Sequence, residues 1–249
     1  MPDFASQRGH NLIEVIVVII IIGILSTVAV RSLNDRTKMA RMEETRHELQ
    51  SLAHAVAGDP RLLSGGVRTD FGYVGDIGSL PPSLDALRQN PGGYATWKGP
   101  YIYDDFSSSG TGTEFMRDAW GRNYLYSGGT AITSTGSGSS VSQVIAVSVA
   151  DLLYNRVATV TTDIDNTPPG DRFRDSVRVI LTYPDGVGSV AIKSLVPRAD
   201  GYAVFDSIPI GIHQLNLIYL PDNDTLSRNI VVNPGGQSYL ELHLATNVW

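Results

Sequence analysis

The chain has 249 residues, which is enough for one large domain or two modest ones in addition to a long helix. Its formal net charge of −6 argues against a surface that binds nucleic acid. It contains no cysteine, so an exported form would have to hold its folds together without disulfides, through full hydrophobic cores or bound metal ions.

The first predicted element is an apolar helix with a single carboxylate close to its start. Within residues 12–30, Glu14 is the only ionisable side chain. A charge costs roughly 2.5 to 3.5 kcal/mol at the centre of a bilayer and less near its surface, so Glu14 needs a partner. The polar stretch 1–9 ends at Gly9, and a cut after Gly9 would place a new amino terminus, at His10, about one helical turn from Glu14. In an array of such helices, the α-amino group of one copy could neutralise the carboxylate of the next.

This arrangement resembles the class III leader of type IV pilins and type II secretion pseudopilins. The resemblance implies a leader peptide over 1–9, cleavage between Gly9 and His10 by a prepilin peptidase, and N-methylation of His10. It also implies that Glu14 acts in filament assembly and that an ATP-driven assembly platform of the inner membrane is a partner. Two residues depart from the family pattern, because His10 stands where Phe or Met is usual and Arg31 where Pro is common.

Two alternative interpretations of the apolar segment stay open. A secretory signal peptide would begin with a clearly positive stretch and end at a small-residue cleavage site, and neither is evident here. A plain signal anchor would account for the hydrophobicity but for neither Gly9 nor Glu14. The apolar segment is followed by four basic residues, Arg31, Arg36, Lys38 and Arg41. By the positive-inside rule they would favour a cytoplasmic location for the rest of the chain, although nearby acids reduce the local positive charge. We expect a single pass through the bacterial inner membrane with the C-terminal domains in the periplasm, leading to a periplasmic or extracellular filament.

The helical pattern continues beyond the apolar segment. Apolar and small residues recur at steps of three and four and form one stripe, made of Met42, Thr45, Leu49, Leu52, Ala53 and Val56. Gly58 and Pro60 then supply a stop signal. The pattern predicts one long helix over 10–57, with about 12–30 in the lipid bilayer or filament core and the remainder packed on a globular head.

The predicted head covers 58–140 and contains short elements separated by loops. A short helix is expected at 83–89, followed by the motifs W-K-G-P-Y at 97–101 and D-A-W-G-R-N-Y-L-Y at 118–126. Both motifs resemble those beside the long helix in major pseudopilins. With the leader, the resemblance covers about residues 9–135.

A calcium site is a further expectation that the resemblance implies. Major pseudopilins commonly carry an acidic loop, S-x-G-x-D-G, and a later D-I pair. Here the loop 134–138 keeps the spacing but has Gly138 in place of the acid, and the later pair is Asp163–Ile164. Calcium prefers six to eight oxygen ligands, several of them carboxylates. Asp163 and Asp165 could supply some of these oxygens, but the lost acid leaves the predicted site incomplete. The alternative is that both are solvated acids in turns.

The C-terminal part changes to short strands and tight turns. We expect an insertion or linker over 141–173 and six or seven short strands over 174–249, which suggests a small β-sandwich that folds alone. The segments D-G-Y-A-V-F and I-P-I-G-I-H-Q-L resemble carboxypeptidase-regulatory or transthyretin-like domains, a family that implies packing or binding. The overall prediction is an α+β chain with a long N-terminal helix, a pilin-type head and an all-β C-terminal domain.

The sequence carries none of the common catalytic motifs, such as G-x-S-x-G, H-E-x-x-H or a P-loop. We therefore expect no enzyme and, apart from calcium, no cofactor. The leading hypothesis is a structural subunit that assembles with itself and other pilin-like subunits in a helical filament. The competing hypothesis is a minor or tip subunit that uses its β-sandwich as an adhesin or ligand-recognition module.

Overall fold

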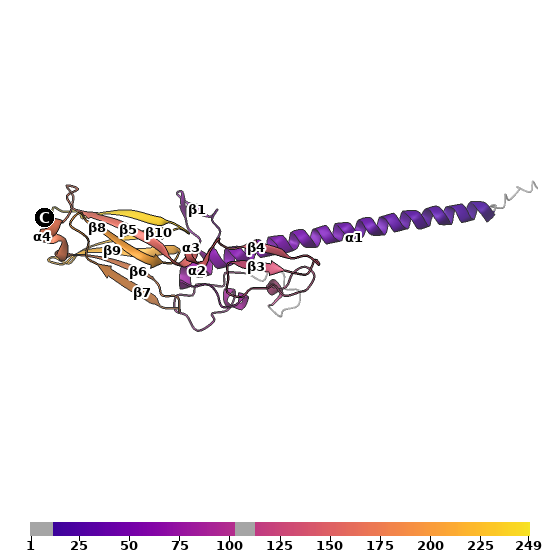
Figure 1. The fold of residues 1–249 in the computed structure, drawn as a ribbon, viewed down its shortest axis with the longest axis horizontal. Coiled ribbons are helices and arrows are strands. Elements are labelled where there is room, and N and C mark those ends of the chain that lie inside the picture. Colours follow the sequence, from indigo (N-terminus) through magenta and orange to yellow (C-terminus); the bar gives the residue numbers. More distant parts are fainter. Residues whose placement is uncertain (1–11, 103–112) are drawn as a thin grey trace, which may run out of the picture. The chain divides into compact units, whose positions relative to one another are not determined.

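The computed structural model describes residues 12–102 and 113–249, which form an α+β fold (Figure 1). A long helix is followed by a largely β region, as the sequence predicts. The predicted leader 1–9 and His10 lie outside the described residues. The chain divides into two compact units, the first ending at Glu44 and the second covering Thr45–Trp249, and each is described by itself.

Helix α1 (Leu12–Ala57) has 46 residues and ends where Gly58 and Pro60 predict. Gly58 adopts φ +81°, and its N–H donates to the His54 carbonyl oxygen at 2.6 Å, which closes the last turn. A Cβ at this position would lie 2.2 Å from the Asp70 carbonyl oxygen. Glycine is therefore required here by both the backbone conformation and the space.

The first part of the second unit consists of short elements joined by loops. They are β1 (Leu63–Ser64), β2 (Val67–Arg68), α2 (Gly72–Ile77), 3₁₀ helices at Leu84–Leu87 and Glu114–Met116, β3 (Ala131–Ser134), β4 (Val141–Val144) and α3 (Val149–Leu153). The helix expected at 83–89 is thus a single 3₁₀ turn, whose Leu84 and Leu87 are buried as predicted. Strands β1 and β2 form one antiparallel pair, and β3 and β4 form another.

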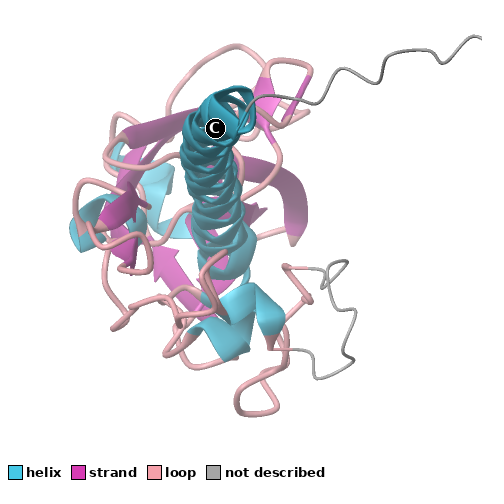
Figure 2. Ribbon diagram, turned by 90° about the vertical axis from the view of Figure 1, so that its right-hand side faces the viewer, coloured by secondary structure: helices cyan, strands magenta, loops and turns pink. Residues whose placement is uncertain are grey.

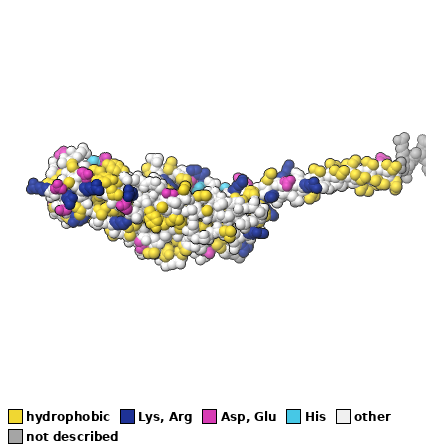
Figure 3. Space-filling view, in the orientation of Figure 1, with side chains coloured by type: hydrophobic (Ala, Val, Ile, Leu, Met, Phe, Trp, Pro, Cys, Tyr) yellow, Lys and Arg dark blue, Asp and Glu magenta, His cyan; other side chains and the backbone are white. Residues whose placement is uncertain are grey.

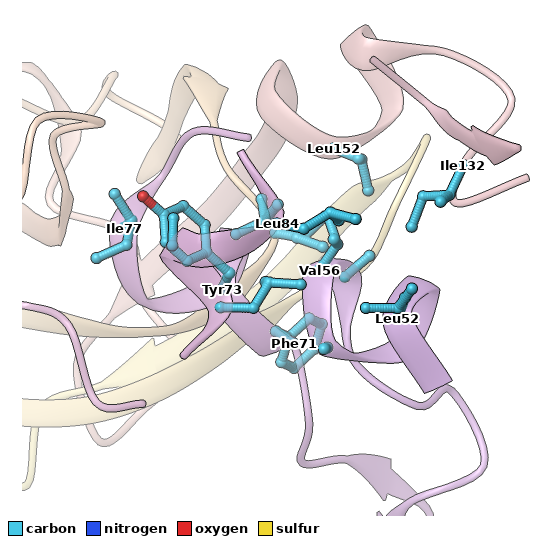
Figure 4. Packing of buried hydrophobic residues seen from close by; sticks show 14 of the residues in the cluster. Leu52, Val56, Phe71, Tyr73, Ile77, Leu84, Ile132 and Leu152 are labelled. Carbon is cyan, nitrogen blue, oxygen red and sulfur yellow. The ribbon is translucent and has the colours of Figure 1, made fainter. Parts of the chain in front are cut away.

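The last three turns of α1 supply one wall of a hydrophobic core. Leu49, Leu52 and Val56 are each at most 1% exposed. They belong to a cluster with Phe71 and with residues of α2, the 3₁₀ turn, β3 and α3, of which Figure 4 labels Tyr73, Ile77, Leu84, Ile132 and Leu152 in addition to Phe71. Burial of one such aliphatic side chain contributes about 1.5 to 3 kcal/mol. The predicted apolar stripe, from Thr45 onward, is therefore the contact between the end of α1 and the head.

The remainder of the second unit is built from two sheets, with only short helical segments between the strands (Figure 2). Its elements are β5 (Asn155–Thr162), α4 (Gly170–Phe173), a 3₁₀ turn at Arg174–Ser176, β6 (Val177–Pro184), β7 (Val190–Leu195), β8 (Tyr202–Ile208), β9 (Gly211–Tyr219), β10 (Asp224–Val232) and β11 (Gln237–His243). One sheet has the order β10-β9-β6-β7, and the other has the order β11-β5-β8.

The buried faces of these two sheets share a second hydrophobic cluster, as in a small β-sandwich. Val157 of β5, Phe205 of β8 and Leu242 of β11 meet Val179 of β6 and Leu217 of β9 in this cluster. All five side chains are at most 1% exposed. The alternation of buried and exposed residues along β6 and β9 follows from the period of two in a strand.

Strand β5 differs from the sequence-based expectation, because it lies within the segment 141–173, for which the sequence predicts an insertion or linker. It is the central strand of its sheet, parallel to β11 and antiparallel to β8. The boundary predicted at residue 174 therefore leaves out the strand that joins β11 to β8. The two-sheet region begins at about Asn155.

Candidate functional site

The first part of α1 forms an uncovered apolar surface. Every side chain from Leu12 to Arg41 is exposed in the single chain. Figure 3 shows hydrophobic side chains over the start of α1, with charged side chains farther along the helix. By length and composition this helix could cross a membrane, and its apolar stretch 12–30 would span about 28 Å at 1.5 Å per residue.

Glu14 lies in the first turn of α1, within this apolar surface. Its neighbours Ile13 and Val15 are 67% and 48% exposed. A carboxylate at the start of a helix interacts favourably with the positive end of the helix dipole. When lipid or other helices cover the surrounding apolar side chains, the carboxylate loses its contact with water. A cationic partner then stabilises the carboxylate more strongly than it would in water. Gly9 and His10, which the sequence links to Glu14, lie outside the described residues.

The second half of α1 is held to the head by polar contacts in addition to its apolar stripe. The hydroxyl of Tyr124 donates to the Glu48 carboxylate, and the Ala119 N–H donates to Thr45 Oγ1 at 3.3 Å. Burial raises the pKa of the Tyr124 phenol, and its bond to Glu48 adds to the shift, so the phenol stays protonated as a donor. The motif at 118–126 thus fastens the head to the helix.

The motif at 97–101 packs in the same way. The Trp97 indole donates to the Ala86 carbonyl oxygen at 3.1 Å, and the Tyr101 hydroxyl donates to Asp76 at 2.9 Å. Lys98 forms an ion pair with Asp76 at 2.8 Å. These residues connect the loop 97–101 to α2 and the 3₁₀ turn, which gives both aromatic motifs a structural role.

A groove of about 600 Å³ opens beside the end of α1 and the segment 143–147. Its polar groups are already engaged in the fold. The Arg68 guanidinium donates to the carbonyl oxygens of Ala57, Gly58 and Asp70, and Asp151 completes a capping box with Ser148. The Arg68 and Asp151 side chains that line the groove therefore take part in hydrogen bonds that stabilise the fold.

The two segments that the predicted calcium site would combine, 134–138 and 163–165, have separate contacts. Asp163 and Asp165 follow β5, where Asp163 Oδ1 accepts the N–H groups of Asp165 and Thr167 at 3.1 and 2.9 Å. The loop 134–138 instead contacts Asp118, next to β3, at the other end of the second unit (Figure 1). In the part of the chain that the structure describes, no three His, Cys, Asp or Glu side chains form a group that could hold a metal ion.

Asp118 is the polar centre of the head that the sequence does not single out. From sequence it is the first residue of an aromatic motif, while two of the four donors to its carboxylate come from a loop sixteen and more positions later. The sequence feature that could have indicated this centre is an acid followed by a W-G turn and, later, by S-x-G at 134–136. Only the folded loop shows that these residues converge.

Comparisons with known proteins give a relative by sequence and weak structural likenesses. The chain is 29% identical over 100 residues to the type II secretion system core protein G of Xanthomonas campestris pv. campestris, an alignment that covers 40% of this chain and 60% of that protein. The chain thus spans less than two thirds of the relative's length. No family model matches the chain.

Two solved structures illustrate the structural likenesses. The Bacillus anthracis TIE protein has a TM-score of 0.31 and 14% identity, with 50% of this chain and 24% of that chain covered. The dioxygenase domain of a dioxygenase and carbohydrate-binding protein fusion from Streptomyces sp. SirexAA-E has a TM-score of 0.27 and 10% identity, with 41% and 86% covered. TM-scores this low do not establish a shared fold or function.

Proposed function

We propose that the protein is a pseudopilin-like structural subunit of a type II secretion pseudopilus or a related type IV pilus-like filament. The observation that carries the proposal is the stretch of 100 residues related to a type II secretion core protein G, in a chain whose first described element is a long helix with an uncovered apolar first part. In this role the apolar half of α1 is the assembly surface. The head and the two-sheet region face outward.

The proposed course begins with insertion of α1 into the bacterial inner membrane. A prepilin peptidase then removes the leader after Gly9, His10 becomes the methylated amino terminus, and an assembly platform extracts the subunit into the filament. The α-amino group at His10 of one subunit pairs with Glu14 of its neighbour. The proposed orientation places the head and the two-sheet region in the periplasm, as the leader motif implies. The basic residues after the apolar segment would favour the opposite orientation by the positive-inside rule.

The proposed role is structural rather than catalytic. The groups that are buried or paired in the head stabilise its fold, as the contacts of Tyr124, Tyr101 and Arg68 illustrate. The two-sheet region would have to fit on the outside of the filament at every repeat, and this favours a specialised or minor subunit over the most abundant one.

Substitution of Gly9 tests the proposed processing. We expect Gly9→Leu to block leader removal and leave an uncleaved membrane protein, since the proposed cut requires a small residue immediately before it. Intact-mass spectrometry of the membrane protein from cells that contain a prepilin peptidase measures this, with Gly23→Ala as the control because its Cβ would meet no atom within 4 Å. A wild-type protein that retains Met1, or that starts near Val30, would refute the proposed processing.

A further inference from the structure

The fold of the head bears on the metal that the family resemblance implies. Major pseudopilins commonly bind calcium in the loop that corresponds to 134–138, and in this sequence Gly138 stands in place of the acid. Calcium needs several carboxylate or carbonyl oxygens directed at one point. The loop 134–138 contains no acid, and its Ser134 and Gly136 donate hydrogen bonds to Asp118.

Both oxygens of the Asp118 carboxylate are occupied by hydrogen bonds. Oδ1 accepts the N–H groups of Trp120 and Arg122 at 3.0 and 2.9 Å. Oδ2 accepts the Ser134 hydroxyl at 2.6 Å and the Gly136 N–H at 3.0 Å. An ionised carboxylate has about four lone-pair sites, so these four donors saturate it. A metal ion could bind Asp118 only by displacing donors that hold the loop.

The surroundings of Asp118 favour the charged, hydrogen-bonded form. The residue is 4% exposed. Burial alone would raise the pKa of this carboxyl group, but the four hydrogen bonds outweigh it and hold the pKa below its usual value. Hydrogen bonds to an ionised acceptor are about twice as strong as those between neutral groups.

The loop fits Asp118 closely. A Cβ on residue 136 would lie 2.3 Å from Asp118 Oδ2, so only glycine allows the N–H at this position to reach the carboxylate. The segment that contains Asp118 is also bound to α1, because the Ala119 N–H donates to Thr45 Oγ1 at 3.3 Å and Thr45 is fully buried. The Asp118 carboxylate therefore joins the turn 119–122 to the loop 134–136, and the neighbouring Ala119 links this turn to α1.

We propose that the Asp118 carboxylate holds the loop 134–138 in place without a metal ion. The head of this protein, unlike that of the pseudopilins it resembles, then folds without calcium. Asp118 is then a positioning residue for the loop 134–138. The inference concerns the stability of the head and does not depend on filament assembly.

The experiment is thermal unfolding of the full chain in detergent, followed by tryptophan fluorescence, in EDTA and in millimolar calcium chloride. We expect the same midpoint within about 1 °C in both, and no heat of calcium binding by titration calorimetry. Asp118→Asn should lower the midpoint by roughly 5 to 10 °C, since the amide cannot accept all four donors and leaves some unsatisfied. Asp222→Asn is the matched control on an exposed turn and should leave the midpoint unchanged.

Ser134→Ala provides a milder test in case Asp118→Asn does not fold, because it removes one donor and leaves the carboxylate in place. It should lower the midpoint less than Asp118→Asn does, again equally in calcium and EDTA. A rise of several degrees in the wild-type midpoint with calcium would overturn the proposal. Midpoints of Asp118→Asn and Ser134→Ala that match the wild type would overturn it as well.

Discussion

Glu14→Gln is expected to leave membrane insertion and leader removal intact but to reduce filament assembly at least roughly tenfold. The change keeps the size of the side chain and removes its charge. Insertion should become slightly easier, because a neutral amide replaces a carboxylate in the apolar surface of α1. Assembly should fail, because the α-amino group of the neighbouring subunit then has no counter-charge.

The size of the effect follows from the cost of an unpaired charge. Removal of one partner from a fully buried ion pair costs roughly 3 to 5 kcal/mol, and about 1.4 kcal/mol already corresponds to a factor of ten. The full cost is an upper bound for Glu14, since the residue lies in the first turn of α1, where water reaches it before assembly. The same contact recurs at each subunit, so even a partial cost suppresses long filaments.

The measurement is the yield of sheared filaments from cells that express the variant without wild-type subunits. Glu44→Gln is the matched control, because it makes the same chemical change in an exposed part of α1 beyond the apolar stretch. An alternative account holds that Glu14 only reaches the lipid headgroups, as long polar side chains at membrane surfaces do. Normal yield from the processed Glu14→Gln subunit would support that alternative and remove the pairing argument.

The second large effect concerns the two-sheet region. A fragment of residues 154–249 should unfold cooperatively, whereas a fragment of 174–249 should show no cooperative transition. The longer fragment keeps β5, which among the described strands is the only one that pairs with β8 or with β11. Without it, both strands lose their ladder partner and the core loses the fully buried Val157. The intact region has its own hydrophobic cluster, which is why it should fold without the head.

Circular dichroism during heating distinguishes the two fragments. Because removal of the central strand eliminates a whole sheet, the expected difference is presence against absence of a transition rather than a shift in midpoint. Val187→Ser in the longer fragment serves as a control, since this side chain is 70% exposed and its replacement should not alter folding. A sigmoidal transition in the 174–249 fragment would show that β5 is dispensable.

The sequence predicts local features of this fold well because they depend on neighbouring residues. The period of the apolar stripe gives α1 its length and its buried face, and Gly58 gives its end. Glu14 is conspicuous as a single carboxylate among apolar residues. These signals need no knowledge of the rest of the chain.

Features that depend on distant residues are not predicted by the local pattern. Strand β5 pairs with β11, about eighty positions later, and its core-facing side chains include the buried hydroxyls Thr159 and Thr161, which obscure the alternation of apolar and polar residues. The convergence of Ser134 and Gly136 on Asp118 is likewise a result of the tertiary fold. For the segment of β5 and for the loop 134–138, composition alone indicates a linker or a loop. The pairing with distant residues that orders both segments leaves little trace in the local sequence.

The central claim is that this chain is built into a filament through α1, and its location in sheared material tests this most directly. Filaments are sheared from cells, purified away from membranes, labelled with antibody to the two-sheet region and viewed by electron microscopy. The account predicts that the chain leaves the membrane with the filaments, with label along their length or, for a minor subunit, at intervals or at one end. A chain that remains entirely with the membranes while filaments without it are released would contradict the account.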